Sequence, residues 1–169
     1  MYEDNQAEFL INDELVEVTQ NSNYPWDGEI EITVNPAHNN FEFPLFLRIP
    51  GWCDQIKIKV NQQEVDPTKK IKNGFVKLER AWNKDDKVEL FLELKPQKIY
   101  ANPAVCENAG KVALQYGPLI YCLEDIDNGS NLSAIALEEN AELKPKGKSQ
   151  LIQMKIPPYT RIKNMKLNR

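Results

Sequence analysis

The sequence predicts an all-β protein, an antiparallel β-sandwich of the jelly-roll or immunoglobulin-like kind. Apolar and polar residues alternate with a period of two in most segments, which is typical of strands with one buried face. Turn-forming residues divide these segments at intervals of about ten residues, and no window sustains the 3.6-residue period of a long helix. The turns predict about eight to eleven strands.

The individual strands follow from this alternation. Half-buried strands are expected at residues 7–11, 15–20, 29–34, 56–60, 76–78 and 88–94. Two further segments, 41–49 and 112–123, are apolar almost throughout, which predicts central strands covered on both faces. Pro44 has no N–H to donate, so it predicts an edge strand, a bulge or a gap in the ladder.

Turn chemistry separates the predicted strands. Asn12-Asp13, Asn61-Gln62 and Asn73-Gly74 are pairs of residue types that favour tight turns. Gly117-Pro118 predicts a sharp bend inside the second apolar segment, and Lys84-Asp85-Asp86 predicts a polar, solvated turn.

The 169 residues suit one domain, or one domain with a small appendage. Residues 1–128 are expected to form the β-sandwich accessory domain, and 129–150 a loop or the remnant of a second β-domain. Residues 151–169 are expected to supply a closing strand that returns to the first sandwich, followed by a basic tail. From Lys144 to Arg169 there are six Lys, two Arg and no acidic residue.

Charge and hydropathy argue against two classes of partner. The net charge of -4 disfavours nucleic-acid binding, which requires a basic face. No apolar run approaches the roughly 18 residues of a membrane span, and the start, Met1-Tyr2-Glu3-Asp4, has no secretory-signal pattern. The basic tail is expected to be solvated or to dock on the acidic remainder of the chain, and binding of an outside polyanion is the less favoured alternative.

The polar residues do not form a recognisable catalytic, cofactor or metal motif. Paired-carboxylate catalysis requires two acidic groups about 5 to 9 Å apart, whereas Asp85-Asp86 and Glu124-Asp125 have the pattern of solvated turn residues. Asp125, Asp127 and Asn128 lack the full spacing of a calcium loop. His38, the single histidine, lies in a turn-rich stretch. We expect free thiols at the three widely spaced cysteines, Cys53, Cys106 and Cys122.

Three tryptophans are the remaining candidates for a site. Indole rings stack on sugars in many carbohydrate-binding sandwiches, but Trp26, Trp52 and Trp82 each adjoin a turn or strand end. A large ring in that position commonly caps the core, so packing in the core or against another domain is favoured over sugar contact.

The sequence around these tryptophans resembles a known family. The relevant segments are Tyr24-Pro25-Trp26-Asp27-Gly28, Leu47-Arg48-Ile49-Pro50-Gly51-Trp52, Leu78-Glu79-Arg80-Ala81-Trp82, and the run from Val112 to Tyr121. In this order they are similar to the C-terminal half of glycoside hydrolase family 127, typified by bacterial β-L-arabinofuranosidases. The resemblance covers roughly residues 7–128.

The resemblance implies an enzyme in which an α/α-barrel catalytic domain precedes β-sandwich domains. In that family a glutamate and cysteines on the barrel hold zinc, and a cysteine is the proposed nucleophile. Cys53, Cys106 and Cys122 fall outside the family's cysteine motifs, and the barrel is absent from this sequence. No catalytic, cofactor or metal residue is therefore expected here, and zinc is expected only in the catalytic domain.

Ile156-Pro157-Pro158-Tyr159 is similar to the word that marks the family's last strand. Because members usually insert a further β-domain before it, we expect that second domain to be largely absent here.

These observations favour a non-catalytic structural accessory domain of a glycosidase acting on arabinose-containing glycans, with the barrel as its partner. Trp26, Trp52 and Trp82 are the candidate interdomain or sugar contacts. A carbohydrate-binding module and a free-standing interaction protein are the alternatives. The resemblance to bacterial enzymes implies a location in the cytoplasm or periplasm.

Overall fold

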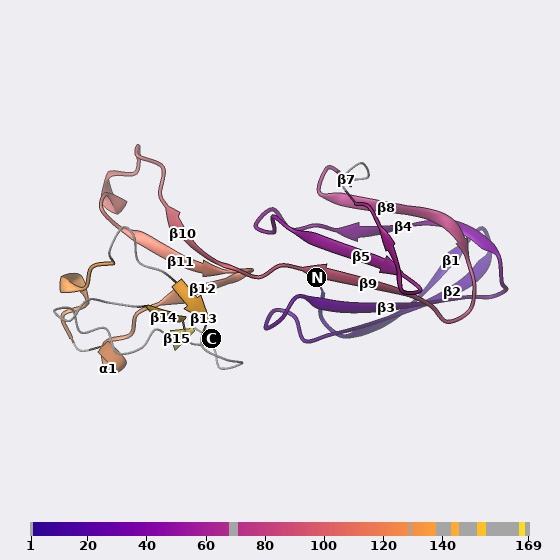
Figure 1. The fold of residues 1–169 in the computed structure, drawn as a ribbon, viewed down its shortest axis with the longest axis horizontal. Helices are drawn as coiled ribbons and strands as arrows, with labels where there is room; N and C mark the ends of the chain where they lie inside the picture. The colour runs from indigo at the N-terminus through magenta and orange to yellow at the C-terminus, as the bar shows by residue number, and fades with distance from the viewer. Residues whose placement is uncertain are drawn as a thin grey trace. The chain divides into compact units, whose positions relative to one another are not determined.

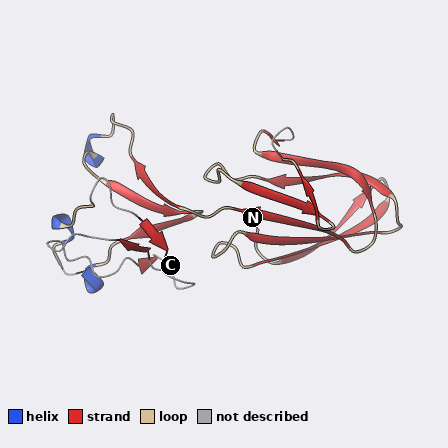
Figure 2. Ribbon diagram, viewed as in Figure 1, coloured by secondary structure: helices blue, strands red, loops and turns tan. Residues whose placement is uncertain are grey.

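A computed structural model describes residues 2–67, 71–128, 130–137, 143–145, 152–154 and 166–167. The chain divides into two compact units, Met1–Leu94 and Lys95–Arg169, called unit 1 and unit 2. Strands dominate both units, and every pairing between described strands is antiparallel (Figure 2). The predicted all-β antiparallel fold is confirmed.

Unit 1 is a two-sheet sandwich (Figure 1). The larger sheet has the order β1-β2-β3-β9-β5-β6 and the smaller sheet has the order β4-β8-β7. The larger sheet comprises β1 (Asn5–Ile11), β2 (Glu14–Ser22), β3 (Glu29–Pro36), β9 (Asp86–Leu92), β5 (Ile56–Val60) and β6 (Gln63–Val65). The smaller sheet comprises β4 (Phe41–Arg48), β8 (Phe75–Trp82) and β7 (Ile71–Lys72).

The period-two pattern creates the core of unit 1. Along β9, Asp86, Val88, Leu90 and Leu92 are buried while the residues between them are exposed. The inward residues of both sheets join in one apolar cluster that includes Val34, Ile58, Leu47 and Val76. Burial of these side chains between the sheets is the main stabilising contribution to unit 1.

Three hairpins of unit 1 confirm the predicted turns. Asn12 and Asp13, Asn61 and Gln62, and Asn73 and Gly74 all have positive φ, between 49° and 77°. Two consecutive positive φ angles define the type I′ turn, whose twist matches that of the strands it joins. These turns connect β1 to β2, β5 to β6, and β7 to β8.

Strand β4 corrects one expectation. It pairs with β8 alone and lies at the edge of its sheet, so the edge position predicted from Pro44 is confirmed. Coverage of both faces is wrong, because Phe43 and Leu47 are buried while Phe46 is 56% exposed. A run of apolar letters does not distinguish a central strand from an edge strand whose outer face also carries apolar side chains.

Unit 2 contains a sheet of order β10-β11-β12-β15 and the pair β13-β14. Its strands are β10 (Pro96–Tyr100), β11 (Val112–Tyr116), β12 (Leu119–Cys122), β13 (Leu143–Pro145), β14 (Ile152–Met154) and β15 (Lys166–Leu167). Short helical turns occur at η1 (Cys106–Asn108), α1 (Asp125–Asn128) and η2 (Leu132–Ala134). Among the residues described in unit 2, the buried core consists of Leu114 and Tyr121.

The domain organisation differs from the expected one. The division falls after Leu94 and not at residue 128, because β10, β11 and β12 pair with one another in a sheet of their own. The last described strand, β15, pairs with β12 of unit 2. The segment Ile156–Tyr159 lies outside the described residues. Of the helices described, none is long and apolar enough to cross a membrane.

Candidate functional site

Trp82 is a core residue of unit 1. Its side chain is 0% exposed, and its Nε1–H donates to the backbone carbonyl of Phe43 at 2.9 Å. The ring also packs against Phe43, with the centroids 5.8 Å apart, and the guanidinium of Arg80 lies 5.2 Å from the ring centroid. This tryptophan is therefore unavailable to a sugar or to another domain, which corrects its place among the candidate contacts.

The other two tryptophans remain partly accessible. Trp52 is half-buried and packs against the unit 1 core, within the Pro50–Cys53 turn in which Cys53 N–H donates to the Pro50 carbonyl at 3.1 Å. Trp26 is 43% exposed, and its N–H closes a turn on the Asn23 carbonyl at 2.9 Å. Only one of the three indoles thus presents a large area to solvent.

The turn that carries Trp26 is held by specific local contacts. Asp27 accepts hydrogen bonds from Asn23 Nδ2 at 3.1 Å and from Glu29 N–H at 3.3 Å. A Cβ on Gly28 would lie 1.8 Å from the carbonyl oxygen of Leu92, so only glycine permits this close approach of two backbones. The motif 24–28 therefore serves to join the β2–β3 connection to the end of β9.

Asp86 is a buried carboxylate, although the turn pattern predicted a solvated side chain at this position. It is 6% exposed, which contradicts the expected solvated turn at this position, whereas Asp85 is exposed. Asp86 accepts hydrogen bonds from Asn61 Nδ2 at 2.8 Å and from Asn83 N–H at 2.9 Å, and Arg80 lies 3.9 Å away. Because its oxygens are occupied by these partners, Asp86 ties two turns together and is not presented to a substrate.

The cysteines are separate free thiols. Burial raises the pKa of the Cys53 thiol, whose Sγ–H donates to the Gln55 carbonyl at 3.2 Å and lies 3.8 Å from the Glu93 carbonyl. A raised pKa keeps the sulfur protonated near neutral pH, and the thiolate is the form that attacks or binds a metal. Within the described ranges, no group of three or more His, Cys, Asp or Glu side chains could hold a metal ion.

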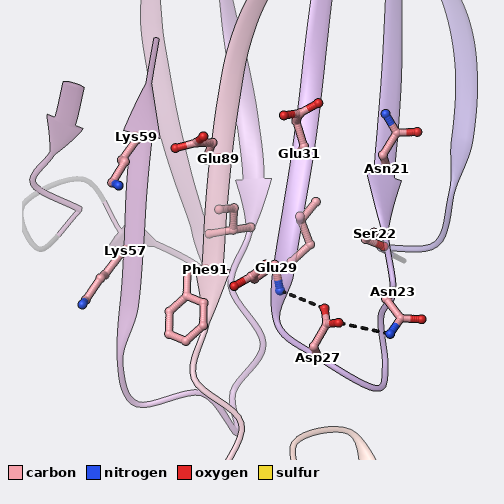
Figure 3. A pocket seen from close by; sticks show the side chains of 12 residues that line it. Asn21, Ser22, Asn23, Asp27, Glu29, Glu31, Lys57, Lys59, Glu89 and Phe91 are labelled. Carbon is pink, nitrogen blue, oxygen red and sulfur yellow. Dashed lines mark hydrogen bonds between the residues drawn. The ribbon is translucent and has the colours of Figure 1, made fainter. Parts of the chain in front are cut away.

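A polar hollow lies on the outer face of the larger sheet of unit 1 (Figure 3). This outer-face hollow has a volume of about 680 Å³ and is lined by residues of β2, β3, β9 and β5 with the β2–β3 turn. Register places Glu31 opposite Glu89, Glu89 opposite Lys59, and Phe91 between Glu29 and Lys57. Figure 3 shows the Phe91 ring among these charged side chains.

Unit 2 carries an exposed connection between β10 and β11. In this β10–β11 arm (residues 101–111) every residue is exposed, and η1 within it buries none. Tyr100 at its base is 64% exposed and Val105 is 41% exposed. Together with Leu137, the arm borders a depression of about 600 Å³. Exposed apolar side chains on an ordered connection are typical of a surface that contacts another protein.

Comparison with known families decides the affiliation of the two units. Residues 1–94 match a family model described as the GH127 middle domain of β-L-arabinofuranosidase, and residues 96–168 match the C-terminal domain of the same family. The chain belongs to glycoside hydrolase family 127. The family boundary coincides with the division into units. A GH127 C-terminal domain is thus present, and the expectation that the second domain is largely absent is wrong.

Individual GH127 relatives are much longer than this chain. The non-reducing end β-L-arabinofuranosidase of Bifidobacterium longum subsp. longum is 39% identical over 133 residues, which cover 76% of this chain and 19% of that protein. A GH127 β-L-arabinofuranosidase from Geobacillus stearothermophilus T6 matches with a TM-score of 0.82 at 42% identity, over 85% of this chain and 22% of that one. A further GH127 β-arabinofuranosidase gives a TM-score of 0.73 at 28% identity, covering 91% and 27%.

The sequence segments that resemble GH127 have structural explanations. They contain the close backbone approach at Gly28, the buried Trp82, and the β11–β12 hairpin at Gly117, where φ is 56°. The outer-face hollow and the β10–β11 arm were not predicted from the sequence. Phe91 was detectable in principle, since an aromatic residue stands at an outward position of β9 between charged neighbours. The arm has no comparable signal, because exposure of a loop depends on what packs over it.

Proposed function

We propose that this chain is a non-catalytic structural accessory region of a β-L-arabinofuranosidase that acts on arabinose-containing glycans. Its partner is the α/α-barrel catalytic domain, which holds the zinc and the nucleophile. Membership of GH127 and the small share of each relative that the chain covers support a place within a larger enzyme. The names of the relatives support the substrate class.

The β10–β11 arm is the observation that carries the accessory role. Val105 in the arm and Tyr100 at its base offer apolar area to a neighbouring domain, and the small residues between them allow close approach of a partner surface. Tyrosine is enriched at the centres of protein interfaces because it buries apolar area while its hydroxyl finds a polar partner. Docking of the arm would cover apolar surface that unit 2 leaves in water.

A second apolar patch of unit 1 supports the same role. Leu10 and Leu15 face each other across the β1–β2 hairpin and are 75% and 48% exposed. Phe9, on the opposite face of β1, is 51% exposed. Strand β1 lies at the edge of the larger sheet, so no further strand of that sheet lies beside it on its outer side. The adjacent exposed side chains of Leu10 and Leu15 at this hairpin end favour contact with another domain.

Co-expression tests this proposal. The Geobacillus relative would be produced without the segment that matches this chain, and the 169-residue chain would be supplied separately with an affinity tag. We expect co-purification of the two, and loss of co-purification with Val105→Asp. Gln63→Asp, which adds the same charge at an exposed position of unit 1, should have no effect. Capture that Val105→Asp leaves intact would refute docking through the arm.

A further inference from the structure

We propose that the outer-face hollow of unit 1 binds a neutral glycan. This function goes beyond the accessory role and does not depend on it, because none of the residues that line the hollow belongs to the β10–β11 arm or to the Leu10–Leu15 pair used for docking. The volume of about 680 Å³ falls within the range of about 300–1,000 Å³ typical of small-molecule sites. The lining is charged and aromatic, which suits a ligand with many hydroxyl groups and one apolar face.

Phe91 supplies the apolar surface of the hollow. It is 38% exposed on the solvent side of β9, where its neighbours along the strand, Leu90 and Leu92, are buried on the opposite side. Its direct cross-strand partners are Glu29 on β3 and Lys57 on β5, so the ring is flanked by hydrogen-bonding groups on both sides (Figure 3). Such a ring can stack on the C–H face of a sugar while the flanking groups reach its hydroxyls.

Four charged side chains of the hollow are uncommitted. Glu31 is paired with Lys87 at 3.1 Å, and Asp27 is occupied by the β2–β3 turn. Across the described part of the chain, no hydrogen bond or ion pair engages the side chains of Glu29, Glu89, Lys57 or Lys59. Glu89 and Lys59 lie directly opposite each other in the register and still do not pair.

These free groups match the chemistry of a diol. A carboxylate has two oxygens that accept hydrogen bonds from adjacent hydroxyls, and an ammonium group donates up to three. Hydrogen bonds with a charged partner are the stronger class, which compensates for the loss of hydration when a polar ligand binds. Glu29 and Lys57 place an acceptor and a donor on either side of Phe91, and Glu89 with Lys59 provides a second set two residues away along the same strands.

The same features disfavour other ligands. Asp27, Glu29, Glu31 and Glu89 outnumber Lys57 and Lys59, so an acidic glycan would be repelled. Strands β3 and β9 are paired on both sides, so their backbone groups are already used. An extended peptide therefore has no sheet edge to join at this place.

Titration of the 169-residue chain with arabino-oligosaccharides tests the proposal, with oligogalacturonate as the acidic comparison. Binding would be followed by chemical shifts in two-dimensional NMR spectra and by calorimetry. We expect saturable binding of the neutral sugar and none of the acidic one. Phe91→Ala should weaken binding roughly tenfold. Glu89→Gln, at an exposed position, tests the polar contacts without disturbing the core and should also weaken binding.

Phe46→Ala is the matched control, because Phe46 is an exposed phenylalanine on the smaller sheet. It should bind the neutral sugar as the unmodified chain does. The proposal is wrong if no neutral sugar saturates the chain, or if folded Phe91→Ala and Glu89→Gln variants bind as well as the Phe46→Ala control. Preferential binding of oligogalacturonate would also overturn it.

Discussion

Units 1 and 2 are both made of antiparallel strands, but the described residues of the two units contribute very different amounts of buried core. In the described residues, unit 1 buries seventeen clustered apolar side chains, whereas unit 2 buries two. The difference arises because unit 1 has two sheets whose apolar faces meet, while the larger sheet of unit 2 leaves Ile99 and Ile120 at 39% and 53% exposure. Unit 1 therefore has a core large enough to fold alone.

Removal of the largest core side chain of unit 1 should have the largest effect on stability and therefore tests the difference between the two units most strongly. Trp82→Ala should lower the free energy of unfolding by about 3–5 kcal/mol, since the ring is fully buried and its Nε1–H bond to Phe43 is lost. Urea unfolding followed by circular dichroism would measure it. Tyr121→Ala in unit 2 should leave the transition of unit 1 in place. Equal effects of the two substitutions on that transition would contradict the division.

The hydrogen bonds that Asp86 accepts from Asn61 and Asn83 offer a second test of unit 1. Asp86→Ala should cost about 2–3 kcal/mol, because Asn61 Nδ2 and Asn83 N–H would lose an ionised acceptor in a buried place. Asp85→Gly is the matched control at the neighbouring exposed position, where φ is 63°, and it should be neutral or slightly stabilising. Thermal unfolding of both variants would decide, and an unchanged Asp86→Ala midpoint would show that these hydrogen bonds contribute nothing.

The pH dependence of stability tests the role of the buried tyrosine Tyr2 in unit 1. Burial raises the pKa of Tyr2 above its ordinary value of 10.0, and its O–H donates to the Arg48 carbonyl. A raised folded-state pKa means that the stabilisation is complete below about pH 10 and is lost as the pH rises through the folded value. Tyr24 is shifted in the same direction by burial.

Tyr2→Phe should therefore cost about 0.5–1.5 kcal/mol at pH 7 through the missing hydrogen bond. Its stability should also fall less steeply than that of the unmodified chain above pH 10. Urea titrations at pH 7 to 11 would follow both effects. A variant that loses stability with the same alkaline slope would show that Tyr2 is not the group that titrates.

The smallest effect is expected when unit 2 is removed altogether. A chain ending at Leu94 should unfold within about 0.5 kcal/mol of the corresponding transition in the whole chain, because the boundary separates two compact units. Residues 95–169 alone should lack a comparably cooperative transition. Calorimetry of both pieces would measure this, and collapse of the shorter chain would refute the independence of unit 1.

Local features of this fold were predictable from sequence, and pairings between distant segments were not. The type I′ turns at residues 12–13, 61–62 and 73–74 depend on residue types within the turn, so their positions could be predicted. Alternation similarly identified the inward residues of β9. The sheet to which β11 and β15 belong depends on which distant strands they pair with, and the alternation of apolar and polar residues does not indicate those partners.

The site followed the same division. Trp82 was identified as a large ring near a strand end, but its burial depends on β4 lying across from it. Asp86 looked like a solvated turn residue because Asn61, its hydrogen-bond partner, is twenty-five residues away in the chain. The outer-face hollow depends on four strands being side by side, which no single segment reveals.

The most direct test of the accessory role is a hydrolysis assay of the purified 169-residue chain. It would be incubated with 4-nitrophenyl β-L-arabinofuranoside and added zinc, with the full-length Geobacillus enzyme as the positive control. The account predicts no release of nitrophenol above the buffer rate, because the reacting groups belong to the catalytic domain. Sustained turnover that a folded Asp86→Asn or Cys53→Ser variant abolishes would contradict it and would place a catalytic centre within these residues.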